Sequence, residues 1–299
     1  MGNKIIAKYL NGNVKVTLFN DGTKISKTDD DEFRPEFAEC IDVTLSERCS
    51  HNCGFCYANC TTDGVIADLR IGSPIYEILD TIPSGTEIAV NINSDIQYGF
   101  EDFLRHMHER NVFVNVTVRQ DDFVKNQELF RYWYNENLIW GIGVSLIEPT
   151  KNFIRLAQSF PTIVIHVIAG VIGSQQMECL ADHELKILVL GYKHVGRGAT
   201  YYGDDVVNKI KWLRNNLPEY VDRFDVMSFD NLALEQLDVR RLLTDKEWSV
   251  FYQGDEGTST FFMNLAEGYF ARDSLTKEHY LLGNNVVDMF KEIAYVHHH

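Results

Sequence analysis

Short segments in which apolar and polar residues alternate open the chain. They read KIIAKYL, VKVTLFN and TKIS, and the dipeptides Asn11-Gly12 and Asp21-Gly22 separate them. These dipeptides tolerate the positive φ angles of two-residue hairpin turns, so the pattern predicts an antiparallel β-meander. The polar run KTDDDEFRPE then ends the alternation. We therefore expect an N-terminal β-meander over residues 1–38.

A different pattern begins at Cys40, where short runs of apolar, β-branched residues alternate with amphipathic segments of about ten to fifteen residues. The apolar runs, which predict strands, lie at 40–45, 87–92, 112–118, 139–146, 162–169, 185–190 and 225–229. The amphipathic segments, which predict helices, lie at 73–82, 99–110, 121–137, 150–160, 174–181 and 203–216. Strands that are buried on both faces and joined by helices form parallel sheets. The pattern predicts an α/β fold in which residues 39–230 form a partial or full TIM-type (β/α) barrel, rather than an open doubly-wound sheet.

The last part of the chain no longer shows this alternation of predicted strands and helices. LALEQLDVRRLL predicts a helix, TSTFFMNLAEGYFARDS a hairpin, and NNVVDMFKEIAYV a closing helix. Residues 231–296 are therefore expected to form an α+β C-terminal extension. The final HHH at 297–299 is typical of the remnant of an expression tag.

Composition and charge disfavour several classes of partner. The chain has 28 Lys and Arg against 43 Asp and Glu, a formal charge of −15 that repels phosphate backbones, so we expect no large nucleic acid. The longest apolar run, around residues 163–171, is too short to span a bilayer, so we expect no membrane partner. The first residues lack the apolar core of a secretory signal. We therefore expect a cytoplasmic protein whose cysteines are reduced.

Four of the six cysteines crowd into CSHNCGFCYANC, directly after the first predicted barrel strand. Chemistry in barrels of this kind lies at the carboxyl ends of the strands, so these cysteines stand at the expected catalytic face. The spacing of Cys49, Cys53 and Cys56 suits three thiolates around one iron–sulfur cluster, with one iron left open. The alternative is a structural zinc site in which Cys60 or His51 is the fourth ligand. The lack of a second cysteine pair downstream favours the iron–sulfur cluster.

The stretch LSERCSHNCGFCYA, with Phe55 before its third cysteine, resembles the signature of the radical S-adenosylmethionine (radical SAM) superfamily. That signature is C-x3-C-x-aromatic-C after the first strand of a partial (β/α)6 barrel. The resemblance implies a [4Fe–4S] cluster on Cys49, Cys53 and Cys56 whose open iron binds S-adenosylmethionine (SAM). It also implies reductive cleavage of SAM, with an electron from a donor such as flavodoxin or ferredoxin, and hydrogen abstraction from an organic substrate. The alternative function is that of a non-catalytic module that binds the cluster and SAM.

Further SAM contacts follow from the same resemblance. The second strand of the family ends in Gly-Gly-Glu, whereas this chain carries Asn93, Ser94 and Asp95 in that region. Their side chains offer acceptor oxygens to the SAM amino group, and a polar turn at the strand end is the alternative. The family places a polar contact to the SAM ribose or carboxylate near Ser145, with Glu148 as an alternative. The remaining residues assigned to the cofactor are Phe55, Tyr57 and Lys193.

Candidate substrate contacts lie at the ends of the later strands. The segment GYKHVGRG supplies Tyr192, Lys193 and Arg197, and its cations are conspicuous in so acidic a chain. They would attract a carboxylate, unless the segment is an exposed polar loop. Arg119 ends the third strand and follows the same reasoning. His166 lies within the fifth strand and is assigned to the substrate, with a hydrogen-bonded core histidine as the alternative.

The sequence indicates the class of substrate only weakly. No cysteine follows Cys179, so the chain cannot build the auxiliary clusters of many peptide-modifying relatives. We therefore favour a small molecule or a nucleotide, with a peptide- or protein-modifying maturase as the alternative. An open groove lined by Asp and Glu would reverse this order, because it would not suit a small anionic ligand.

Overall fold

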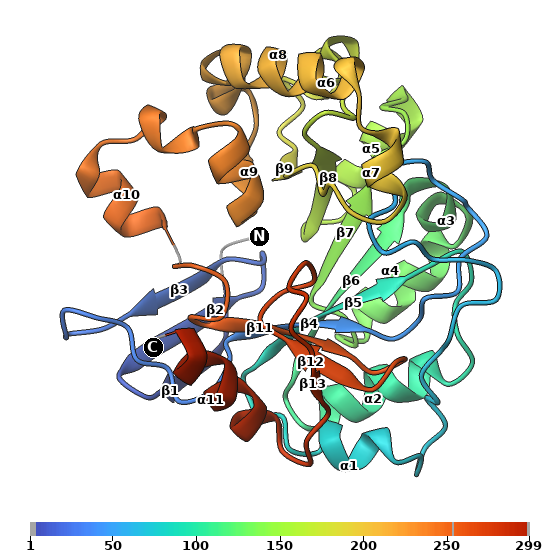
Figure 1. Cartoon of the computed structure of the whole chain (residues 1–299), viewed down its shortest axis with the longest axis vertical. Coiled ribbons are helices and arrows are strands. Elements are labelled where there is room, and N and C mark those ends of the chain that lie inside the picture. Colours follow the sequence, from blue (N-terminus) through green and yellow to red (C-terminus); the bar gives the residue numbers. More distant parts are fainter. Residues whose placement is uncertain (1–3, 253, 298–299) are drawn as a thin grey trace.

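The computed structural model describes residues 4–252 and 254–297 (Figure 1). The predicted meander is confirmed as a three-stranded antiparallel sheet of β1 (Ile5–Asn11), β2 (Val14–Phe19) and β3 (Lys24–Lys27). Gly12 turns the chain between β1 and β2 with a φ of 59°, the left-handed conformation that an Asn-Gly turn requires.

The main sheet has ten strands, and seven of them are neighbours in the order of the sequence. These parallel strands are β4 (Cys40–Thr44), β5 (Glu87–Ile92), β6 (Phe113–Arg119), β7 (Gly141–Ser145), β8 (Ile163–Ile168), β9 (Lys186–Leu190) and β10 (Val226–Phe229). All seven predicted strands are confirmed. Their sequential order excludes a doubly-wound sheet, in which the strand order reverses at a switch point.

The parallel strands do not close into a ring. Within residues 4–252 and 254–297, β10 pairs only with β9, and β13 ends the sheet on the other side. The sequence predicted a partial or full barrel, and the open sheet of parallel strands corresponds to the partial form. The physical reason lies after β10, where the chain continues into helices instead of a further strand that could pair with it.

The C-terminal extension adds three strands to the same sheet. The predicted hairpin is confirmed as β11 (Thr260–Asn264) and β12 (Tyr269–Ala271), which pair antiparallel, and β13 (Tyr280–Leu281) follows β12. The sequence did not predict that β11 would also pair in parallel with β4. The boundary proposed after residue 230 stays a prediction, since strands from both sides of it share one sheet.

Helices cover one face of the parallel sheet (Figure 1). The helices of the described ranges are α1 (Ile75–Leu79), α2 (Phe100–Glu109), α3 (Gln120–Lys125), α4 (Gln127–Asn135), α5 (Lys151–Gln158), α6 (Ser174–Leu180), α7 (Arg197–Tyr201), α8 (Asp204–Tyr220), α9 (Asn231–Gln236), α10 (Asp245–Phe251) and α11 (Val286–His297). The segment predicted as one helix at 121–137 breaks at Asn126, whose ψ of 20° is not helical. No helix in the described ranges is long and apolar enough to cross a membrane.

The two faces of the parallel strands differ in polarity. In β6, Val114, Val116 and Val118 are buried in the core beneath the helices, and the residues between them are only half-buried. The less buried face carries polar side chains, namely Asp42, Thr44, Asn91, Asn115, Thr117, Arg119, Ser145 and His166. The expectation that both faces are apolar and buried was therefore wrong. One face packs against helices, and the other lines a cavity.

The meander covers the amino-terminal ends of the parallel strands. Val14, Val16 and Leu18 of β2 are buried against Phe113 and Trp140, which stand at the starts of β6 and β7. The Trp140 indole also donates a hydrogen bond of 3.1 Å to a main-chain carbonyl of β2. The meander thus packs over this end of the strands, where Trp140 and Gly22 line the cavity.

Candidate active site

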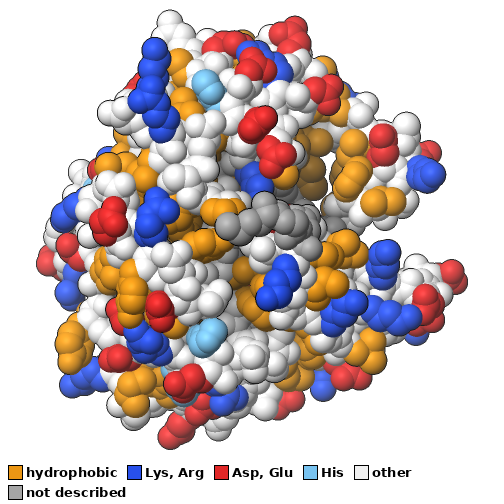
Figure 2. Space-filling model, turned by 180° about the vertical axis from the view of Figure 1, so that it is seen from behind, with side chains coloured by type: hydrophobic (Ala, Val, Ile, Leu, Met, Phe, Trp, Pro, Cys, Tyr) orange, Lys and Arg blue, Asp and Glu red, His pale blue; other side chains and the backbone are white. Residues whose placement is uncertain are grey.

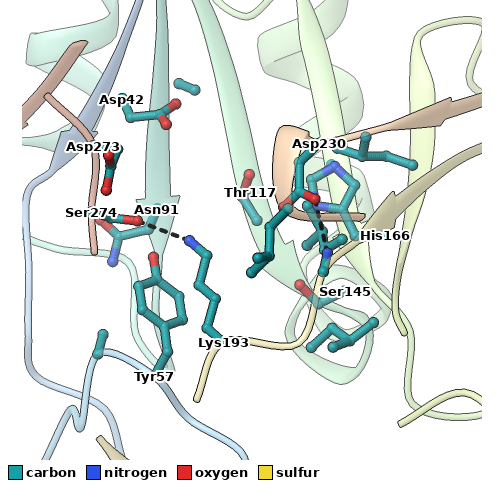
Figure 3. A pocket seen from close by; sticks show the side chains of 18 of the residues that line it. Asp42, Tyr57, Asn91, Thr117, Ser145, His166, Lys193, Asp230, Asp273 and Ser274 are labelled. Atoms are coloured by element: carbon teal, nitrogen blue, oxygen red, sulfur yellow. Dashed lines mark hydrogen bonds between the residues drawn. The ribbon is translucent and has the colours of Figure 1, made fainter. Parts of the chain in front are cut away.

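A cavity of about 2210 Å³ occupies the polar face of the parallel sheet. Its walls are the inward side chains of the parallel strands, the loop after β4 that carries the cysteines, and parts of the C-terminal extension (Figure 3). Figure 2 shows the surface hollowed between α10 and the N-terminal strands, with acidic and basic side chains interspersed around the hollow. The cavity includes the carboxyl ends of the strands, which is where the barrel geometry predicts chemistry.

The cysteine loop, residues 45–66, is tied to the end of β5. The side-chain amides of Asn91 and Asn93 donate hydrogen bonds of 3.0 and 2.7 Å to the Ser46 carbonyl. The main chain of Cys49 donates a hydrogen bond of 2.8 Å to the Thr61 carbonyl and so joins the two arms of the loop. The loop is therefore held before any cofactor contributes to its shape.

Cys49, Cys53 and Cys56 line the cavity as half-buried free thiols. Among the described residues, no three cysteine sulfurs lie within 4.8 Å of one another. Sulfurs that share one zinc ion stand about 3.8 Å apart, given Zn–S bonds of about 2.3 Å and tetrahedral angles. His51, the alternative zinc ligand, instead has its Nε2 at 2.5 Å from Oδ2 of Asp122. The donor set fits an iron–sulfur cluster better than one zinc ion.

Cys60 lies against Cys56. A hydrogen bond from the Cys60 thiol lowers the pKa of Cys56 to about 5, and the same bond, together with burial, raises the pKa of Cys60. Burial raises the pKa of Cys53, and the charge of Arg119 opposes this shift. Since thiolates are the ligating form, the loop favours that form at Cys56.

Arg197, predicted to contact the substrate, contacts the cysteine loop. Its guanidinium donates hydrogen bonds to the carbonyls of Cys53 and Cys60, at 3.0 and 2.9 Å, and to Oδ1 of Asn59 at 3.3 Å. Its main-chain N–H donates to the Cys56 carbonyl at 3.0 Å. These bonds engage the side chain in positioning the loop, and the substrate contact stays a prediction.

The other residues of the segment GYKHVGRG separate in space. Tyr192 is buried, and its hydroxyl donates a hydrogen bond of 2.7 Å to the Gly198 carbonyl. Lys193 points into the cavity (Figure 3), where its Nζ donates to Oγ of Ser274 at 2.8 Å and lies 4.0 Å from the centre of the Tyr57 ring. Of these predicted contacts, Lys193 is the one whose charged group faces the open space.

The residues assigned to SAM do not all reach the cavity. Asn93 lines it, whereas Ser94 accepts a hydrogen bond of 3.0 Å from the Ser50 main chain and Asp95 is exposed outside the lining. Phe55 lines the cavity and packs its ring against Tyr201, with 6.0 Å between centroids. Tyr57 and Ser145 also belong to the lining. Their contacts with SAM stay predictions.

Three predicted residues form one row across neighbouring strands. Arg119 of β6 is in register with Ser145 of β7, which is in register with His166 of β8. His166 is half-buried in the cavity wall, where desolvation lowers its pKa to about 4, so its imidazole is neutral at pH 7. The alternative, a hydrogen-bonded core histidine, does not fit, since the ring makes no hydrogen bond to the described residues and faces the cavity (Figure 3), and the substrate contact stays a prediction.

Sequence reasoning missed three carboxylates of the cavity wall. They are Asp42 within β4, Asp230 directly after β10, and Glu256 just before β11. Only Asp42 left a signal in the sequence, as a charged residue in the middle of the apolar run CIDVTL. The other two stand in loops, where an acidic residue is unremarkable.

The fold resembles that of Streptococcus suis SuiB. A crystal structure of SuiB bound to S-adenosylmethionine matches with a TM-score of 0.55 at 13% identity, over 83% of this chain and 64% of that chain. A structure of SuiB bound to its precursor peptide SuiA matches with a TM-score of 0.54 at 12% identity, over 86% and 65%. This chain thus covers less than two thirds of SuiB. No family model matches the chain, and no curated protein matches it.

The row that begins at Arg119 reaches the cysteine loop. Nη1 of Arg119 donates a hydrogen bond of 3.4 Å to Sγ of Cys53, and its Nε lies 3.1 Å from Oδ1 of Asp121. A positive donor beside a ligating sulfur stabilises the more negative, reduced state of an iron–sulfur cluster. Arg119 was assigned to the substrate from the sequence, and this contact places it beside a predicted cluster ligand.

We expect Arg119→Gln to lower the midpoint potential of the reconstituted cluster, because the variant removes a positive charge next to Cys53. A redox titration followed by electron paramagnetic resonance measures the potential without any substrate. Arg119→Lys, which keeps the charge, should shift it less. An unchanged potential in the glutamine variant at full iron content would contradict the expectation.

Proposed function

We propose that this chain is a radical SAM enzyme in which Cys49, Cys53 and Cys56 hold a [4Fe–4S] cluster. The observation that carries the proposal is the placement of these thiols after β4, on the wall of a large cavity, where no three cysteine sulfurs of the described residues lie as close together as one zinc ion requires. The likeness of the fold to a protein crystallised with SAM supports SAM as the second cofactor. When bound, the cluster would supply the electron that cleaves the SAM sulfonium.

The residues of the chain would bind and orient SAM. Oδ1 of Asn93 accepts one hydrogen bond, from Asn91, and keeps a lone pair for the SAM amino group. The Ser145 hydroxyl makes no hydrogen bond within the described ranges and faces the cavity, so it remains available to the SAM ribose or carboxylate. The surrounding strands and helices shield this part of the cavity and thereby limit side reactions with water.

A peptide is the substrate class that we propose, in place of the small molecule or nucleotide favoured by the sequence. The cavity, at about 2210 Å³, exceeds the roughly 300–1,000 Å³ of ordinary small-molecule sites. Asp and Glu side chains line it, which is part of the condition, an open groove with an acidic lining, that favours a peptide. The structure of SuiB with its precursor peptide SuiA supports the same choice. A small-molecule substrate is the second candidate.

The test is anaerobic reconstitution of the full chain with iron and sulfide, followed by incubation with SAM and dithionite. Dithionite stands in for the flavodoxin or ferredoxin that we expect as the electron donor. Steady release of 5′-deoxyadenosine and methionine is the expected result. Binding of the cluster and of SAM without cleavage would support the non-catalytic module instead, and a stoichiometric zinc ion without a cluster would overturn the proposal.

A further inference from the structure

Three residues, Ser50, His51 and Asn52, separate the first two predicted cluster ligands. The main chain of Ser50 donates a hydrogen bond of 3.0 Å to Oγ of Ser94, and Asn52 has a φ of 50°, in the left-handed region. Asparagine adopts this conformation more readily than most residues with a Cβ, yet it persists only where the surroundings hold it. The direction of the Cys53 side chain therefore depends on how this turn is held.

The side chain of His51 holds the turn from the side of β6. Its Nε2 lies 2.5 Å from Oδ2 of Asp122, and because a carboxylate only accepts hydrogen bonds, Nε2 carries the hydrogen. Asp122 is 8% exposed and stands in the first turn of α3, directly after β6, while His51 is half-buried. Because both groups are largely shielded from water, this hydrogen bond is stronger than an exposed one.

The end of β6 also carries the arginine that contacts Cys53. Nη1 of Arg119 donates to Sγ of Cys53 at 3.4 Å, and its Nε lies 3.1 Å from Oδ1 of Asp121, which orients the guanidinium. Residues 119–122 thus contact the cysteine loop at two points, the thiol of Cys53 and the imidazole of His51. These two points are only two positions apart along the loop, so fixing one of them constrains the other.

A divalent cation is the alternative explanation for these side chains, since His51, Asp121 and Asp122 each offer a ligand atom within 4.8 Å of the others. Nitrogen and oxygen ligands of one tetrahedral zinc ion, at about 2.0–2.1 Å from the metal, stand roughly 3.3 Å apart. The 2.5 Å between Nε2 of His51 and Oδ2 of Asp122 is shorter than that. The guanidinium of Arg119 beside Asp121 also repels a cation there. The geometry is therefore that of a hydrogen-bonded pair.

Other anchors of the cysteine loop act on its main chain. They are the hydrogen bonds from Arg197, from the two asparagines of β5 and its end, and to Ser94. The contact of His51 instead joins a loop side chain to the strand end that carries Arg119. Displacing His51 from Asp122 would therefore change the distance from Arg119 to Cys53.

We propose that His51 is a positioning residue of the radical SAM site, whose hydrogen bond to Asp122 keeps Cys53 against the guanidinium of Arg119. A positive donor at a ligating sulfur stabilises the reduced state of an iron–sulfur cluster. His51 thereby raises the reduction potential of the cluster through Arg119. This inference rests on the proposed function for the identity of the cluster, and it adds a residue on which the potential of that cluster depends.

The test is a redox titration of the reconstituted full chain, followed by electron paramagnetic resonance, in His51→Asn and His51→Gln. The side-chain nitrogen of glutamine reaches about as far as Nε2 of histidine, whereas that of asparagine falls short. We expect His51→Asn to lower the midpoint potential toward that of Arg119→Gln, and His51→Gln to keep the parent value. In the Arg119→Gln background, His51→Asn should shift the potential no further, because the effects of coupled residues are not additive.

The matched control is His106→Asn. His106 forms a second histidine–aspartate pair, with 2.7 Å between its Nε2 and Oδ1 of Asp80, on the surface of α2. This variant should keep the parent potential. The inference would be overturned by an unchanged potential in His51→Asn at full iron content, by an equal shift in His51→Gln, or by additive shifts in the double variant. One Zn²⁺ per chain beyond the cluster, lost in His51→Asn, would overturn it in favour of a metal site.

Hydrogen–deuterium exchange of the apoprotein gives a readout that needs no cluster. Amides of residues 49–56 should exchange severalfold faster in His51→Asn than in the parent chain, and at the parent rate in His51→Gln. Equal exchange in both variants would show that His51 does not hold the loop and would overturn the inference. Iron content and release of 5′-deoxyadenosine, measured on the reconstituted samples, separate a failure of this inference from a failure of the radical SAM proposal.

Discussion

Replacement of Cys49, Cys53 or Cys56 with alanine is expected to abolish incorporation of the iron–sulfur cluster and, with it, cleavage of SAM. Each thiol would ligate one iron of the proposed cluster, and loss of one ligand opens a second iron to solvent. Iron and sulfide content, together with the visible absorption of the reconstituted protein, measure the first effect. Release of 5′-deoxyadenosine measures the second and should fall to background in all three variants.

The matched control for these variants is Cys60→Ala. Cys60 stands in the same loop and contacts Cys56, yet it lies outside the C-x3-C-x2-C spacing. We expect it to retain the cluster. The opposite pattern, in which Cys60→Ala loses the metal as completely as the other three, would indicate four cysteine ligands and favour the zinc site.

Gly196→Ala is expected to destabilise the protein by at least about 2 kcal/mol, because it combines backbone strain with a steric clash. Gly196 has a φ of 57° and a ψ of −140°, outside the regions open to residues with a Cβ. A Cβ at this position would stand 2.3 Å from the Tyr57 carbonyl oxygen and 2.9 Å from that of Cys56. The substitution should therefore push the cysteine loop away from Arg197 and lower the cluster content as well.

The control for this variant is Gly203→Ala. Gly203 has an extended φ of −167°, and a Cβ there would meet nothing within 4 Å. Its free energy of unfolding should stay within about 0.5 kcal/mol of the parent chain. Chemical denaturation of the apoprotein compares the two variants. Equal stability would mean that the close approach of Gly196 to the loop does not constrain the fold.

Local patterns in the sequence were enough to predict much of the architecture. The meander, the parallel strands and the hairpin of β11 and β12 were predicted because strand periodicity and turn dipeptides act over a few residues. The candidate cluster ligands were equally accessible, since Cys49, Cys53 and Cys56 lie within eight consecutive positions. A strand, a turn or a set of ligands whose pattern lies within a few consecutive residues could therefore be predicted from the sequence.

Contacts between distant segments were decided only by the tertiary structure. The pairing of β11 with β4 and the bonds from Arg197 to the cysteine loop join residues far apart in the chain, and nothing local encodes them. The open edge of the sheet likewise depends on what β10 meets in space. Asp42, Asp230 and Glu256 line one cavity for the same reason, because each stands alone in the sequence and the cavity exists only once the sheet and its C-terminal extension enclose it.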